Sequence, residues 1–176
     1  MKKQPKSVKH IINAFIELRS SRPLEKIMIT ELCEKADINK STFYAYFKDI
    51  YDLSDQLEEQ VIKRILESLP SPEIITSDPA MMTRLLVSAY QANNSLIGIL
   101  FSGNRISLLP EKIEKSIKEL YYSVYPGKKG DIETDLTLSY KIYGAYYAYF
   151  KNDYNESEKI DVICRLTAGN ERKESA

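Results

Sequence analysis

Residues 40–48 carry the side chains of this chain that are best suited to chemistry with another molecule. Their sequence, Lys-Ser-Thr-Phe-Tyr-Ala-Tyr-Phe-Lys, combines two ammonium groups with four hydroxyl groups. Ammonium groups bind phosphate oxygens, and hydroxyl groups can contact both phosphates and the edges of bases. This composition predicts that the segment contacts nucleic acid.

The spacing of apolar residues predicts three short helices that position this segment. We expect helices roughly over residues 6–20, 29–36 and 40–47, the third preceded by Asn39 as an N-cap. Residues 36–39 leave room for only a short turn between the second and third helices, and Leu32, Cys33, Ile38 and Phe43 can close a small core around it. This is the spacing of a helix-turn-helix, whose third helix lies in the major groove of DNA.

In that arrangement the start of the third helix lies nearest to the bases. Lys40 is placed to contact guanine or phosphate, and Ser41 and Thr42 offer short donors and acceptors. Tyr44 and Tyr46 can reach phosphates or base edges with their hydroxyl groups. The alternative is a bundle of three ordinary helices with polar outer faces, which spacing alone does not exclude.

The first 55 residues contain a more specific pattern. It comprises Leu32-Cys33, Ala36, Ile38-Asn39, Thr42-Phe43-Tyr44, Tyr46-Phe47 and Leu53. In this pattern the chain resembles the N-terminal DNA-binding domain of the tetracycline-repressor-like (TetR) family of transcriptional regulators. The resemblance implies a homodimer that binds a pseudo-palindromic operator in double-stranded DNA. The DNA-binding residues that we expect are Thr30, Lys40, Ser41, Thr42, Tyr44, Ala45, Tyr46 and Lys48.

Four positions depart from the family pattern: Met28, where a threonine that caps the second helix is frequent, Tyr46, where histidine is common, and Asp37 and Ile50. Asp37 stands where glycine is usual, in a turn expected to be left-handed, which Asp tolerates less well than Gly. Ile50 stands where a lysine that contacts phosphate is frequent, although Lys48 could compensate. The departures at Asp37 and Ile50 motivate an alternative, a TetR-like helical protein that acts through a protein partner, as a co-activator or interaction module without its own effector.

The remainder of the chain also has the apolar spacing of helices. We expect a helix after Asp49, whose stripe of leucine, valine and isoleucine ends at Pro70, and further helices after Asp78, from Pro110, over residues 131–152 and from Asn155 to near Gly169. Residues 93–95 are expected to interrupt the helix after Asp78. The prediction is an all-α protein of about nine helices, with a helix-turn-helix domain over residues 1–48 and a helical-bundle domain for regulation and dimerisation over residues 49–176.

Two further sites are expected in the second domain. Small and apolar residues on the last two helices could pair with a second copy in a four-helix interface or pack only within the monomer; these are Gly144, Ala145, Ala148, Ile160, Ile163 and Leu166. Nine of the 13 tyrosines fall between Tyr121 and Tyr154, which suggests either core or a pocket for a small organic effector. The expected pocket residues are Met82, Leu85, Leu86, Tyr90, Phe101, Tyr121, Tyr143 and Tyr147.

Other classes of function lack the residues that they need. His10 is the only histidine, and no phosphate loop or zinc-ligand spacing is present, so we expect no enzyme, no metal and no cofactor. Two distant cysteines and the absence of a long apolar run favour a cytoplasmic protein with no membrane association. Residues 1–50 hold ten Lys/Arg against six Asp/Glu in a chain of zero net charge, which suits a basic N-terminal domain that meets phosphate.

Together these features predict a sequence-specific DNA-binding transcriptional regulator. We expect a homodimeric repressor whose operator binding is controlled by a small-molecule effector. A ligand can act in this way only if it prefers the dimer geometry in which the two recognition helices are wrongly spaced for DNA. The helix after Asp49 is the expected lever, because its start belongs to the first domain and its apolar stripe to the second.

Overall fold

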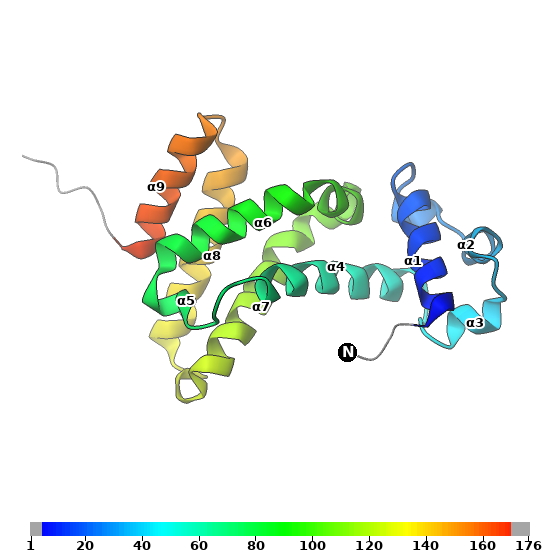
Figure 1. The fold of residues 1–176 in the computed structure, drawn as a ribbon, viewed down its shortest axis with the longest axis horizontal. Helices are drawn as coiled ribbons and strands as arrows, with labels where there is room; N and C mark the ends of the chain where they lie inside the picture. Colours follow the sequence, from blue (N-terminus) through cyan, green and yellow to red (C-terminus); the bar gives the residue numbers. More distant parts are fainter. Residues whose placement is uncertain (1–4, 170–176) are drawn as a thin grey trace, which may run out of the picture. The chain divides into compact units, whose positions relative to one another are not determined.

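The computed structural model describes residues 5–169, which form helices joined by short turns (Figure 1). Over these residues the chain contains nine α-helices and three short 3-10 helices, without a β-strand. This confirms the predicted all-α class of about nine helices. Within the same residues, no helix is both long and apolar enough to cross a membrane.

The chain divides into two compact units. The head unit comprises the residues up to Val61 together with Ser95–Ile106, and the body unit comprises Ile62–Asn94 and the residues from Ser107 onward. The head unit therefore includes more than the predicted domain of residues 1–48. It also takes in the first part of α4 (Ile50–Glu67), the end of α6 (Pro79–Leu100) and most of η2 (Gly103–Ser107).

The head unit is organised around the three predicted N-terminal helices. These are α1 (Lys6–Arg19), α2 (Ile29–Ala36) and α3 (Lys40–Tyr44), with the 3-10 turn η1 (Leu24–Lys26) between α1 and α2. The fully buried apolar side chains of the unit come from every one of its α-helices and from the residue after α6: Ile11, Phe15, Leu32, Phe43, Leu53, Leu100 and Phe101. Burial of this apolar surface supplies the main driving force for packing α1 to α4 together.

Local sequence explains two of the helix ends in the head unit. Asp37 ends α2 in the left-handed region, at φ 52°, as expected for the position where the family pattern has glycine. Asp49 caps α4 by accepting the backbone N–H groups of Tyr51 and Asp52, each at 2.8 Å. Two expectations were wrong: α3 ends at Tyr44 rather than Phe47, and the side chain of Asn39 makes no capping hydrogen bond.

Two arginines connect the end of α6 to the rest of the head unit. Arg19 of α1 donates to the backbone oxygen of Ser102 at 2.8 Å. Arg105 of η2 donates to the carboxylates of Asp55 and Glu58 on α4. These polar contacts fix the segment after α6 against α1 and α4, and Glu58 is completely buried by them.

The body unit is a bundle built from the longer helices. It contains α5 (Ile74–Ser77), the first part of α6, α7 (Leu108–Val124), η3 (Pro126–Lys128), α8 (Ile132–Lys151) and α9 (Glu156–Ala168). In it, α8 packs against α7 and α9. The expected helix starts at Asp78, Asp131 and Asn155 are confirmed, because each side chain accepts a backbone N–H of the following turn.

Two boundaries in this part of the chain differ from the sequence-based expectation. Residues 93–95 lie inside the continuous helix α6, so the predicted interruption was wrong. The side-chain amide of Asn93 donates to the backbone oxygen of Ala89 at 2.8 Å, which lets a polar residue be accommodated without breaking the helix. The helix expected from Pro110 begins earlier, at Leu108, and Pro110 lies in its first turn, where its missing N–H costs nothing.

Candidate nucleic-acid interface and ligand cavity

Two phenylalanines fix the orientation of α3 in the head unit. Phe43 is fully buried and Phe47 is 5% exposed, with their ring centroids 5.6 Å apart. The ring of Tyr44 meets that of Phe43 edge-on at 5.5 Å. Because successive residues of a helix point in different directions, burying Phe43 turns its neighbours outward.

The predicted DNA-binding residues lie mainly on the outside of the head unit. Tyr44 is 55% exposed and Tyr46 is 42% exposed, although both are large aromatic side chains. Thr42 is half-buried beside the core residue Phe43. The remaining predicted contacts are all exposed: Thr30, Lys40, Ser41, Ala45 and Lys48.

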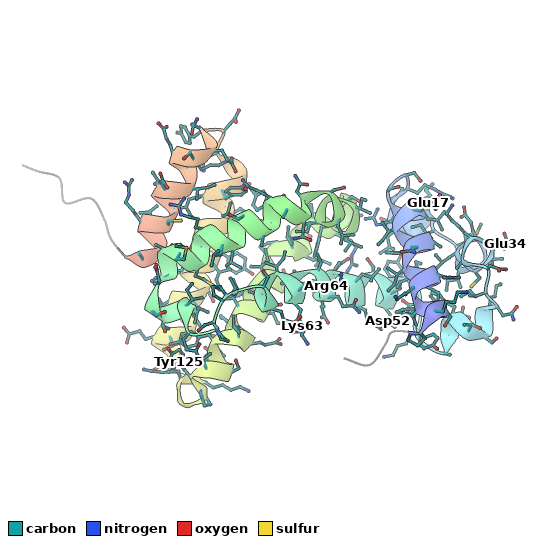
Figure 2. The ribbon with its side chains drawn as sticks, viewed as in Figure 1. Glu17, Glu34, Asp52, Lys63, Arg64 and Tyr125 are labelled. Carbon is teal, nitrogen blue, oxygen red and sulfur yellow. The ribbon has the colours of Figure 1, made fainter. Side chains whose placement is uncertain are left out.

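Charge at this surface comes from two lysines and the start of α4. Within the part of the chain that the structure describes, neither Lys40 nor Lys48 has a carboxylate in salt-bridge range. Asp52 lies at the start of α4 (Figure 2), and its pKa is lowered chiefly by the backbone N–H of Lys48, which donates to it at 2.9 Å. Ile50 is uncharged, and at 7% exposed it packs in the core. This position therefore offers no cation to a phosphate.

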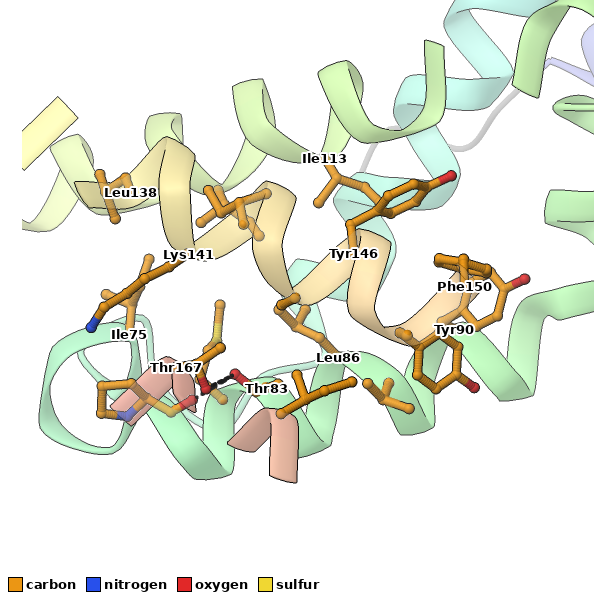
Figure 3. Close-up of a pocket in the computed structure, with 18 residues that line it drawn as sticks. Ile75, Thr83, Leu86, Tyr90, Ile113, Leu138, Lys141, Tyr146, Phe150 and Thr167 are labelled. Carbon is orange, nitrogen blue, oxygen red and sulfur yellow. Dashed lines mark hydrogen bonds between the residues drawn. The ribbon is translucent and has the colours of Figure 1, made fainter. Parts of the chain in front are cut away.

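The body unit contains a cavity of ≈ 170 Å³ among α5, α6, α7, α8 and α9 (Figure 3). Its wall is almost entirely apolar, with Leu86 of α6, Ile113 of α7 and Leu138 of α8 among the lining residues. A cavity of about 150 Å³ with an apolar lining is large enough to hold a benzene molecule. This cavity can therefore accommodate a small organic molecule of about that size.

Polar groups occur at two places in the cavity wall. At one, the hydroxyl groups of Thr83 and Thr167 lie 2.9 Å apart, and Lys141 extends beside Ile75 (Figure 3). At the other, Tyr90 and Tyr146 both pack against Phe150, with ring centroids 5.0 and 4.6 Å from it. Burial raises the pKa of both tyrosines above the ordinary value for a phenol, which is itself well above neutral pH.

The structure brings together some of the residues predicted for a pocket. Met82, Leu86 and Tyr90 line the cavity. Leu85, Tyr121, Tyr143 and Tyr147 lie outside its lining, and Phe101 is a fully buried core residue of the head unit. Tyr147 is 46% exposed, since it points away from the cavity-lining face of α8.

Sequence reasoning missed the lining residues on that face of α8. They follow helical spacing: Leu138, Lys141, Ile142, Ala145, Tyr146, Tyr149 and Phe150. The signal was present in this three- and four-residue repeat, which distinguishes one face of the helix from the other. Tyrosine content alone did not separate the two faces, because tyrosines occur on both.

The opposite face of α8 is apolar and exposed. Ile132 is 76% exposed, Leu136 is 63% exposed and Tyr140 is 82% exposed, at intervals of four residues. On α9, Val162 and Leu166 are also exposed. We call these five residues the outer apolar face; an apolar surface of this kind marks an interaction site more often than a single exposed side chain does.

The residues predicted for a dimer interface are divided between the two sides of the helices. Gly144 and Leu166 are exposed, whereas Ala148 and Ile160 are half-buried. Ala145 and Ile163 line the cavity, and Ile163 is only 3% exposed within the monomer. A partner helix could therefore reach Gly144 and Leu166, while Ile163 already packs inside its own chain.

Comparisons with known proteins identified no relative of this chain. A scan against protein-family models, a search of curated proteins and a search of solved structures each returned no match.

Proposed function

We propose that this protein is a sequence-specific DNA-binding transcriptional regulator of the TetR type. In this proposal it acts as a homodimeric repressor, and a small molecule bound in the body unit controls its affinity for an operator. The observation that carries the proposal is the outward presentation of Lys40, Ser41 and Tyr44 on a short helix anchored by the buried ring of Phe43.

The surface of α3 has the chemistry that a DNA groove requires. Lys40 and Lys48 supply ammonium groups for phosphate or guanine, and neither is neutralised by a described carboxylate. The hydroxyl groups of Ser41, Tyr44 and Tyr46 can both donate and accept. Tyr44 and Tyr46 are both exposed between the buried rings of Phe43 and Phe47, and contact with DNA would give these two large side chains a role.

The outer apolar face supports homodimerisation. An operator with two-fold symmetry is read by a two-fold dimer, whose partners contribute the same surface. Ile132, Leu136 and Tyr140 on α8, together with Val162 and Leu166 on α9, are exposed apolar side chains that a second copy would cover. Pairing both helices with their symmetry mates would bury this face in a four-helix interface.

The cavity supports control by an effector. It lies among five helices of the body unit and its lining is largely apolar, as is usual for sites that hold small organic molecules. Helix α6 contributes residues to the cavity wall, and its last residues belong to the head unit. A ligand that changes the position of α6 would therefore affect the conformation of both units. Such a ligand must favour one arrangement over another to change DNA affinity.

Binding to DNA from upstream of the protein's own gene tests the proposal. Fluorescence anisotropy with a labelled duplex should give a specific complex whose affinity falls steeply with salt. Lys40→Ala should weaken this complex and reduce the slope of log affinity against log salt by about 1. Lys26→Ala is the matched control, because it removes an exposed lysine from η1 of the same unit and should leave binding unchanged.

The alternative function, action through a protein partner, makes a different prediction in the same experiment. Buried Ile50 and the strained turn at Asp37 favour it, because both depart from the pattern of the DNA-binding family. If no duplex is preferred over random DNA at low salt, and a protein partner is still captured by the Thr42→Ala and Tyr44→Ala variants, the alternative replaces the proposal.

A further inference from the structure

Lys141 is the single charged residue among the 18 that line the cavity of the body unit (Figure 3). It is half-buried, and its aliphatic stem forms part of the wall while its ammonium group extends beside Ile75. Among the described residues no carboxylate pairs with it. Because lysine packs its stem against apolar surface and leaves its ammonium group able to bind other groups, this ammonium without a carboxylate partner is available to an anionic group of a ligand.

We infer that the cavity binds an organic acid, with an apolar body about the size of one substituted aromatic ring and a carboxylate that pairs with Lys141. This inference rests on the proposed function only in treating the cavity as a ligand site. It adds the charge and the shape of the ligand, which neither the motif of the head unit nor the apolar lining specifies.

The other polar groups of the lining agree with this class of ligand. The hydroxyl groups of Thr83 and Thr167 also lie within hydrogen-bond distance of backbone oxygens, those of Pro79 at 2.8 Å and Cys164 at 3.0 Å. Each hydroxyl has one proton, so donating it to a ligand carboxylate would replace one of these bonds. Hydroxyl groups both donate and accept, and so they do not select a charge. An ammonium group only donates, and it therefore sets the sign.

The aromatic side chains in another part of the cavity wall determine which uncharged body the ligand can have. Tyr90, Tyr146 and Phe150 present rings and no charge, because a phenol is neutral at pH 7 and burial raises the pKa of both tyrosines further. Aromatic rings also attract cations, so this wall alone would admit an amine. With Lys141 in the wall of the same cavity of ≈ 170 Å³, an amine meets a like charge, which disfavours it relative to an acid.

Three probes with the same carbon skeleton separate these possibilities. They are 3-phenylpropanoate, 3-phenylpropan-1-ol and 3-phenylpropan-1-amine, which carry negative, zero and positive charge at pH 7. Isothermal titration calorimetry with the full chain, in the absence of DNA, should rank the acid tightest and the amine weakest. We expect the acid to bind at least about tenfold more tightly than the alcohol, as charge-assisted hydrogen bonds in partly dry sites allow.

Variants locate the effect at Lys141. Lys141→Met keeps the apolar stem and should reduce the acid-to-alcohol affinity ratio to about one, while affinity for the alcohol is retained. Lys151→Met is the matched control on the same helix; its ammonium lies 5.6 Å from the ring centroid of Tyr147, outside the lining, and the ratio should not change. Ala145→Phe fills the cavity and should weaken all three probes together, with circular dichroism checking that the chain remains folded.

Three results would overturn the inference: equal affinity for acid and alcohol, tighter binding of the amine, or an acid preference that survives Lys141→Met. The absence of any probe binding tighter than about 1 mM would also overturn it. These results do not depend on DNA. A Lys141-dependent acid site in a chain that does not bind DNA would support the inference and refute the proposed regulator.

Discussion

Removing the guanidinium of Arg105 should be among the most damaging single changes in the head unit. Its partner Glu58 is 0% exposed, and Arg105 itself is only 13% exposed at its side chain. Arg105 Nη2 donates to Glu58 at 2.7 Å, Arg105 Nε donates to the other oxygen of the same carboxylate, and the hydroxyl of Ser54 donates to it at 2.8 Å. The hydrogen bond from Arg105 to Glu58 is the chief reason that the pKa of Arg105 is raised.

The expected magnitude follows from what Arg105→Met leaves behind. The carboxylate of Glu58 would stay buried without its guanidinium, and breaking a buried pair in this way costs about 3–5 kcal/mol. Replacing both partners with apolar residues removes the unpaired charge, and such double replacements are often neutral or better. We therefore expect Arg105→Met to lower the free energy of unfolding by about 3–5 kcal/mol, and Arg105→Met with Glu58→Met to recover most of that loss.

Urea unfolding followed by circular dichroism measures this difference, and hydrogen exchange assigns the loss to the head unit. Arg84→Met is the control, because its bond to Asp161 is made between side chains that are 47% and 54% exposed. Exposed pairs contribute little, and the midpoint of this variant should hardly move. If Arg105→Met is as mild as Arg84→Met, or if the double variant is less stable than the single one, the reasoning about the buried pair is refuted.

Three further outcomes are expected. At Asp37, whose φ of 52° is left-handed, substitution by valine should lower the free energy of unfolding by about 1–2 kcal/mol, whereas Asp37→Gly should preserve or raise it; urea titration distinguishes them. In analytical ultracentrifugation, the Leu136→Arg and Tyr140→Arg double variant should sediment as a monomer at concentrations where the parent is a dimer, and an unchanged dimer would contradict the role of the outer apolar face. The pKa of Asp135 is lowered chiefly by the hydrogen bond from Lys118, so its carboxylate stabilises the fold above an ordinary Asp pKa of about 3.9 and this contribution is lost as pH falls. When the pH is lowered from 7 to below an Asp pKa of about 3.9, the unfolding temperature of Asp135→Asn should fall less than that of the parent. An equal fall for both would contradict a stabilising role of the Asp135 carboxylate.

Much of the fold can be read from the sequence because its signals are local. Asp49, Asp131 and Asn155 each cap a helix through an oxygen that reaches the next turn, and this geometry depends on only three or four residues. The left-handed turn at Asp37 and the left-handed end of α9 at Gly169 are equally local. Apolar spacing then identifies which face of each helix is buried.

The features that were missed have different causes. Helix α6 continues through residues 93–95 because the side chain of Asn93 donates to the backbone oxygen of Ala89, and nothing in the structure explains the missing cap at Asn39. The cavity requires five helices at once, so the role of Lys141 could not be found from α8 alone. Phe101 was predicted for a pocket because it is large and aromatic, but it belongs to the core of the head unit, which only the division of α6 between the units reveals.

The central claim is that the exposed side of α3 reads a DNA sequence. The most direct measurement is the affinity of the full chain for the best duplex selected from a random pool, compared with a scrambled duplex of the same composition at the same salt concentration. The account predicts a preference of about 1,000-fold or more, lost in Tyr44→Ala. Equal affinity for the two duplexes would contradict it.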